Sequence, residues 1–335
     1  MTELEIEDLN ILIASEQQRI QQWKSLSHLP VSEQQKQSTI GLKKPSLLTR
    51  PFDAAKIPDF ALKCPVDGAL FHKIAKHAVI FEPIEVTEKN IECARTYVGN
   101  KLGYDLISDI EIVRIPHHLW DLGQSSEAFV IPGGYKNHHI FMPSHFASPE
   151  ELLCHEIAHT AHYTAQRMNG EYFSFFPRSL TAEMVAHYVQ FNFIKDNLNI
   201  QYFNSAILQL VEASYAHLIY QYAITKNNGH FPSYSEFIHS EIARPIKDNW
   251  DLDILERTFH ELTNDTERIT ERFHRSIALI LALILIKEHE GFRKLIYLDN
   301  GEIPFIDLLT SSFPSVDFVS KWENASESII SLFSH

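Results

Sequence analysis

The segment SPEELLCHEIAHTAHY, residues 148–163, carries the clearest local signal in the chain. Ser148 is a good helix N-cap, Pro149 suits the first helical position, and Glu151 stands three residues after the cap, as in a capping box. A helix is therefore predicted to begin at residue 149. That helix carries the strongest candidates for chemistry in a chain that holds 19 histidines.

Two histidines on this predicted helix, His155 and His159, stand four residues apart. Residues at that spacing share a helix face, so both imidazoles could reach a single metal ion. Glu156, about 100° further round the helix axis, could act on a water molecule at that ion. The alternative is a helix whose polar residues face solvent. A third histidine, His162, is displaced from His155 by about 10 Å along the axis, so it is interpreted as a core histidine or a support for a ligand.

A catalytic zinc site needs a third protein ligand, and the best candidate is Glu183. It lies in the segment FPRSLTAEMVAHY, residues 176–188, which is predicted to form a second helix with Glu183 near its start. Val185, Val189 and Phe193 would give that helix a packing face. The 24 residues from His159 to Glu183 leave room for a turn between antiparallel helices. The alternative for Glu183 is a solvated carboxylate.

These two segments resemble the zincin metallopeptidases, and among them the gluzincin-like group. The His-Glu-x-x-His pattern is followed by Glu183, an Ala three residues later and Tyr188, as in that group. The resemblance implies one Zn²⁺ per chain, held by His155, His159 and Glu183, with Glu156 as the catalytic base. It also implies a protease that hydrolyses internal peptide bonds of a protein or peptide substrate.

The resemblance further implies where other site residues lie. The strand at 139–142 would be the edge strand that aligns an extended substrate. His274 is the candidate for stabilising the oxyanion, with Tyr220 and Tyr222 as alternatives. The chain also departs from the family, because His187 replaces an Asp that orients a zinc histidine in thermolysin-like enzymes. Lys136 stands where aminopeptidases have an acidic residue, which favours an internal-bond peptidase.

Local patterns around the motif predict an α+β fold of zincin-like type. Thr87 should cap a helix that ends near Gly99. Short β-branched runs at 110–116, 129–131 and 139–142 predict strands, and the turn residues between the last two predict a hairpin. After residue 148 the pattern is helical almost to the end. We therefore expect a small strand-rich upper part with an edge strand and a mainly helical lower part.

Composition and charge exclude several classes of function. The 335 residues are 44% apolar and carry a formal charge of -14, so no overall positive field would attract nucleic acid or an anionic membrane. The apolar run 277–286 is too short to span a bilayer and predicts a buried helix. Acidic residues at the N-terminus argue against a cleavable signal peptide, so a cytoplasmic protein, or one exported without such a signal, is expected.

The domain organisation is predicted as an N-terminal extension, residues 1–50, followed by a metallopeptidase domain, residues 51–335. The extension could be solvated or a docked arm. Two alternatives to a protease stay open. One is a catalytically inactive zincin-like module that binds a metal or a partner, and the other is a helical interaction protein in which the motif occurs by chance.

Overall fold

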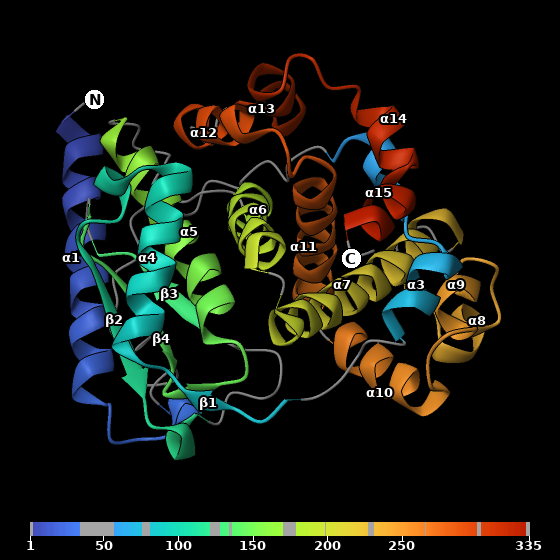
Figure 1. Cartoon of the computed structure of the whole chain (residues 1–335), viewed down its shortest axis with the longest axis horizontal. Helices are drawn as coiled ribbons and strands as arrows, with labels where there is room; N and C mark the ends of the chain where they lie inside the picture. The colour runs from blue at the N-terminus through green and yellow to red at the C-terminus, as the bar shows by residue number, and fades with distance from the viewer. Residues whose placement is uncertain are drawn as a thin grey trace. The chain divides into compact units, whose positions relative to one another are not determined.

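The computed structural model describes residues 3–33, 57–75, 81–120, 128–133, 136–169, 179–197, 199–226, 231–264, 266–299 and 303–332. It is a mixture of helices and small sheets, with helix predominant, as the sequence predicts (Figure 1). The chain forms two compact units built from segments distant in sequence. Unit 1 consists of Met1–Lys56, Glu82–Arg178 and His289–Pro304, and unit 2 of Ile57–Phe81, Ser179–Glu288 and Phe305–His335. The boundary predicted near residue 50 lies outside the described residues.

Unit 1 contains all the strands found among the described residues. Its elements are α1 (Glu3–Ser25), β1 (Ile84–Glu85), α4 (Glu88–Leu102), η3 (Tyr104–Leu106), β2 (Ile110–Ile115), η4 (His117–Leu119), β3 (Phe129–Ile131), β4 (His138–Pro143), β5 (His145–Phe146), α5 (Pro149–Met168) and α12 (His289–Leu298). The short strands β1 and β5 pair with each other in an antiparallel ladder.

The main sheet of unit 1 has the strand order β2-β4-β3. Strand β4 runs antiparallel to β3, which confirms the predicted hairpin, and parallel to β2. Every residue of β4 is buried. The prediction that residues 139–142 form an edge strand is wrong, because β4 is central and both of its edges are already paired. The composition of a strand predicts that it forms but does not give its place in the sheet.

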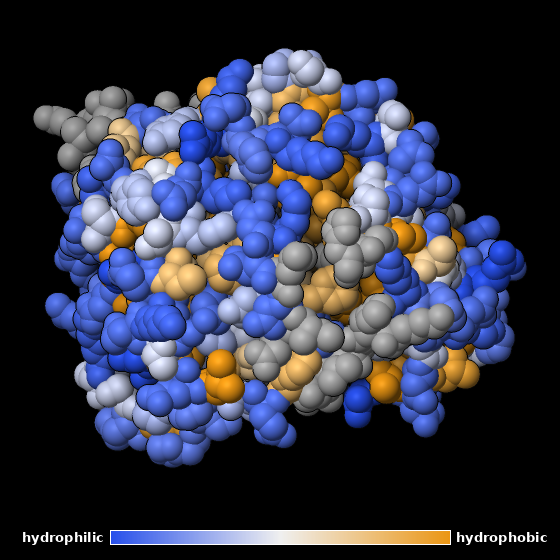
Figure 2. Space-filling model, viewed as in Figure 1, coloured by the Kyte–Doolittle hydropathy of each residue, from blue (hydrophilic) through white to orange (hydrophobic). Residues whose placement is uncertain are grey.

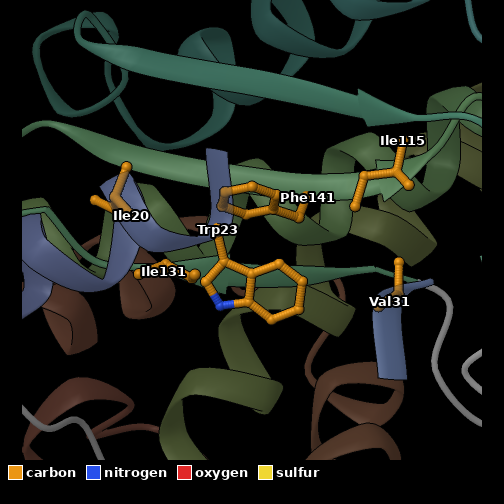
Figure 3. Close-up of a cluster of buried hydrophobic side chains, with 6 residues drawn as sticks. All are labelled: Ile20, Trp23, Val31, Ile115, Ile131 and Phe141. Carbon is orange, nitrogen blue, oxygen red and sulfur yellow. The ribbon is translucent and has the colours of Figure 1, made fainter. Parts of the chain in front are cut away.

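Helices cover both faces of this sheet (Figure 1). Trp23 of α1 packs on one face, with its ring 5.4 Å from that of Phe141 and 4.9 Å from that of Phe129. Figure 3 shows Trp23 beside Ile131 and Phe141, in a buried cluster that also includes Ile20. Helix α5 packs on β3 and β4, and α4 packs along α5. The described part of the N-terminal segment is therefore a docked helix, one of the two possibilities that the sequence left open.

Helix α4 begins where the sequence predicts and ends one turn later. Thr87 and Asn90 form a reciprocal capping box, in which each side chain accepts a hydrogen bond from the other residue's backbone N–H. The helix passes through Gly99 and ends at Leu102, and Gly103 follows with φ of 128°. A positive φ is easily adopted only by glycine, so Gly103 is the terminator. Gly99 instead gives room for the Tyr104 ring, which would lie 2.6 Å from a Cβ at position 99.

The described residues of unit 2 form helices joined by turns and irregular segments, with no strand among them. Its elements are η2 (Asp59–Leu62), α3 (Gly68–Ala75), α6 (Ser179–Asn197), α7 (Ile200–Lys226), α8 (Tyr234–Ile238), α9 (Arg244–Lys247), α10 (Leu252–Thr263), α11 (Thr266–Ile284), α13 (Phe305–Ser312), α14 (Phe318–Glu323) and α15 (Ala325–Leu332). Helix α11 packs against both α6 and α7. Residues 277–286 are all buried, as predicted for the apolar run.

Hydrophilic residues cover most of the face of the molecule shown in Figure 2. Single exposed apolar residues, such as Tyr104 and Leu252, are normal on a protein surface. None of the described helices combines the length and the apolar character needed to cross a bilayer.

Candidate metal centre

The helix that carries the histidine motif begins at the predicted residue. Ser148 is the N-cap of α5 and Pro149 occupies the first turn. The Ser148 side chain makes no hydrogen bond to the helix backbone, so it does not cap α5 as a capping box would; its hydroxyl instead donates to the Glu151 carboxylate, with 2.7 Å between the oxygens. Helix α5 is buried over most of its length. The side chains of the motif are therefore held in one place by packing on several sides.

His155 and His159 are brought together on α5. Their Nε2 atoms are 3.1 Å apart and their ring planes are nearly perpendicular, at 85°. Two nitrogens at about 2.0–2.1 Å from one zinc ion in tetrahedral geometry would be about 3.3 Å apart. The pair therefore fits two ligands of a single zinc. Side chains of His155 and Glu156 are nearly excluded from water, with 3% and 7% of their surface exposed.

A second polar cluster lies further along α5, around His162. The His162 Nε2 atom is 3.2 Å from the Asp299 carboxylate, and both side chains are buried. Gln166 Nε2 donates to the backbone carbonyl and to the carboxylate of Asp299, at 3.1 and 3.0 Å. His162 thus has an acidic neighbour within the core of unit 1, in keeping with its interpretation as a core histidine. The analysis of local spacing missed Asp299, which directly follows α12 and is distant in sequence.

Glu183 belongs to α6 in unit 2, near the start of the helix, as predicted. One of its carboxylate oxygens, Oε2, is 3.4 Å from Arg275 Nε and 3.4 Å from His187 Nε2. His187, at the position where thermolysin-like enzymes have an Asp, therefore contacts the candidate ligand Glu183. Its other ring nitrogen, Nδ1, is 2.9 Å from Gln190 Oε1. Sequence analysis missed Arg275, because only the packing of α11 on α6 brings it to Glu183.

The three candidates for stabilising an oxyanion are also in unit 2. His274 lies on α11, directly before Arg275, and is partly buried. Burial lowers the pKa of its imidazole, so the neutral form is favoured near pH 7. Tyr220 stacks on Phe273, with the ring centres 4.1 Å apart. Tyr222 makes an edge-to-face contact with Phe237 at 5.9 Å.

Comparison with protein-family models, with curated proteins and with solved structures gives no match. The chemistry of the centre is therefore inferred from the residues themselves. Two imidazole nitrogens that face the same point repel each other through their lone pairs unless a proton or a cation lies between them. A buried pair of this kind with an adjacent carboxylic side chain is suited to bind a borderline-soft divalent cation such as zinc.

Proposed function

We propose that the protein is a zinc-dependent protease of zincin type that hydrolyses internal peptide bonds of a protein substrate. The observation that carries the proposal is the 3.1 Å separation of the His155 and His159 Nε2 atoms, with Glu156 between the two residues on the same buried helix. A helix whose polar residues merely face solvent would not bury these side chains. The burial therefore favours a site over the solvated alternative.

Glu183 is proposed as the third ligand, so that each chain binds one zinc ion. The resemblance to the gluzincin-like group supports this assignment, because Glu183 lies near the start of α6, as expected for the third ligand of that group. Two nitrogens and one carboxylate oxygen are a known donor set for a catalytic zinc, which keeps a fourth position open for water or substrate. Arg275 and His187 both approach Oε2 of Glu183, which restrains the orientation of the carboxylate.

The proposed reaction assigns one role to each side chain. When bound, zinc would polarise the scissile carbonyl and make a nearby water molecule more acidic. Glu156 accepts a proton from that water and returns it to the leaving amine. His274 is proposed to donate a hydrogen bond to the negative charge that develops on the carbonyl oxygen. Tyr220 stacks on Phe273 and Tyr222 makes an edge-to-face contact with Phe237, and these aromatic contacts make the two tyrosines weaker candidates.

Elemental analysis and a proteome-wide cleavage comparison test the proposal together. The purified protein should carry about one zinc per chain, and His155→Ala, His159→Ala and Glu183→Ala should each lose it. Glu156→Gln should keep the metal and the fold but lose proteolysis, because an amide cannot accept the proton. With a cleaved peptide from that comparison as the substrate for steady-state kinetics, His274→Phe should keep zinc and KM while kcat falls by about 10² to 10³.

Each contrary result points to a specific alternative. Cleavage that persists in Glu156→Gln would contradict the mechanism. Zinc retained by the wild type without any cleavage product would favour a binding module. The absence of stoichiometric zinc would favour a helical interaction protein, and retention of zinc by Glu183→Ala alone would remove that residue from the ligand set.

A further inference from the structure

Strand β2 has one edge that no other strand of the described chain occupies. It pairs with β4 on one side only and ends the sheet order β2-β4-β3. Unpaired N–H and C=O groups along such an edge are a template on which another extended chain can add. This edge is at the opposite end of the sheet from β3.

Two hydrogen bonds show which backbone groups of β2 face the open edge. Ser144 N donates to Ile115 O at 2.7 Å, so the backbone of Ile115 faces the β4 side. Arg95 of α4 donates from Nη2 to Ile110 O at 2.6 Å, so the backbone of Ile110 faces the other side. In a strand the N–H and C=O of one residue point to the same side, and those of every second residue along the strand point to that side as well. The N–H and C=O of Ile112 therefore point to the open edge.

A cavity of about 800 Å³ lies at this edge of β2, within unit 1. Its walls are α1, α4 and, beside the start of β4, Gly133, Asn137 and His139; four consecutive residues of the chain, 109–112, also line it. Successive side chains of a strand point to opposite faces, so a cavity lined by consecutive residues reaches the edge of the strand and not one face alone. Its volume lies within the range of ligand sites, about 300–1,000 Å³.

The lining of this cavity is predominantly acidic. It contains the carboxylates of Glu88, Glu92, Asp109 and Glu111 and the cationic side chains of Lys24 and Arg95. Both cations are engaged within the wall, since Lys24 pairs with Glu111 at 2.7 Å and Arg95 donates to the Ile110 carbonyl.

Two of these acids, Glu92 and Asp109, are exposed to solvent. Glu88 pairs with Arg114 and Glu111 with Lys24, so a ligand would find the negative charges of Glu92 and Asp109 easiest to neutralise. A cationic ligand is thus favoured over an anionic one.

We propose that this cavity docks an extended, basic peptide segment of a partner protein, which adds to β2 as a further strand. The backbone of the segment would pair with the N–H and C=O of Ile112, and its lysine or arginine side chains would meet Glu92 and Asp109. Strand addition of this kind obtains affinity from main-chain hydrogen bonds and specificity from the pockets that flank the strand. The proposal does not depend on the metal centre.

Three fluorescently labelled hexapeptides with blocked ends test the proposal. The first alternates Lys and Val, the second alternates Glu and Val, and the third is the Lys-Val peptide with alternate backbone amides N-methylated. The Lys-Val peptide should bind and should slow hydrogen exchange of the Ile112 amide. The Glu-Val and the N-methylated peptides should each bind at least about tenfold more weakly, a loss of about 1.4 kcal/mol.

Variants of the protein test whether peptide binding depends on the cavity or only on the overall charge of the protein. Glu92→Lys combined with Asp109→Lys should weaken binding of the Lys-Val peptide by about tenfold or more. The matched control Glu85→Lys changes an exposed acid on β1, outside the cavity, and should leave binding unchanged. Equal binding of all three peptides, no binding at all, or equal effects of the two sets of variants would overturn the proposal.

Discussion

Glu183 can serve as a reproducible metal ligand only if its carboxylate keeps one orientation. The contacts of Arg275 and His187 with a single oxygen of that carboxylate provide this restraint within unit 2. Groups that hold a metal ligand in place affect metal affinity although they never touch the ion. Arg275 is therefore a positioning residue for the proposed site.

We predict that Arg275→Gln lowers zinc affinity by about 10- to 100-fold, because the carboxylate loses its charged partner. Competition with a chromophoric chelator measures the change. Arg272→Gln is the matched control, since Arg272 lies on the same helix and pairs with Glu212 at the same distance of 3.4 Å. Equal affinity in the two variants would contradict a positioning role.

The sequence predicts those residues of the site that lie close together in the chain. His155, Glu156 and His159 follow from helical periodicity alone, and the structure puts them on one helix as expected. Asp299 beside His162, and Arg275 beside Glu183, depend on which helices pack together. No spacing rule connects residues so far apart in the chain, so these contacts could be found only in the folded structure.

At the scale of single elements, α1 is held in unit 1 by an aromatic contact and by a buried ion pair. Arg167 of α5 donates to both carboxylate oxygens of Glu16, at 2.9 and 3.2 Å. The Arg167 side chain is fully buried. Removing one partner of such a pair leaves a charge in a poorly hydrated environment, which costs more than the pair itself contributes.

Glu16→Leu is predicted to destabilise unit 1 by about 3–5 kcal/mol, and the double variant with Arg167→Met should recover much of that loss. Urea unfolding followed by tryptophan fluorescence measures both in a background in which the other three tryptophans are replaced by Phe, because Trp23 lies in the core cluster of the same unit. Gln18→Leu, an exposed position on α1, controls for the added apolar side chain. A double variant as unstable as Glu16→Leu would show that the pair is not the cause.

The strands themselves were easier to predict than the order in which they pair in the sheet. The strands at 110–116, 129–131 and 139–142 were recognisable from β-branched residues and turn signals, and all three form. Their order in the sheet was not recognisable, because the parallel pairing of β2 with β4 is made by residues of distant parts of the sequence. Helix ends were similarly ambiguous, since both Gly99 and Gly103 are possible terminators and only Gly103 adopts a positive φ.

At the scale of the whole molecule, each unit encloses a histidine that is kept neutral. Burial holds the pKa of His138 in unit 1 well below its usual range, and lowers the pKa of His217 in unit 2 to about 3. His138 contacts the Thr164 hydroxyl and His217 the Ser276 hydroxyl, each at 3.1 Å. Both units should therefore resist protonation of these side chains.

Acid should destabilise both units for this reason. A histidine whose pKa is lowered by folding takes up its proton more readily in the unfolded chain, so stability falls as pH drops below about 6.5. For His217 the free energy of unfolding should fall by up to about 1.4 kcal/mol per pH unit between pH 6.5 and its folded pKa. Urea midpoints at pH 7 and pH 4.5 measure this slope.

His217→Gln removes the titrating group and should reduce the loss of stability between these two pH values. The exposed His260→Gln should leave that loss unchanged. His138→Gln tests the corresponding effect in unit 1. An acid response identical to wild type in His217→Gln and in His138→Gln would assign the destabilisation to other groups.

The discontinuity of unit 1 has a consequence for synthesis on the ribosome. Helix α5 is complete at residue 168, but Asp299, the acidic neighbour of its buried His162, follows the whole of Ser179–Glu288. At about 5–20 residues per second, synthesis of the 131 residues from 168 to 299 takes roughly 7–26 s. During this interval His162 and Gln166 have to keep water as their partner. The core of unit 1 is thus expected to close only after residue 299 has left the exit tunnel, when much of unit 2 has already emerged.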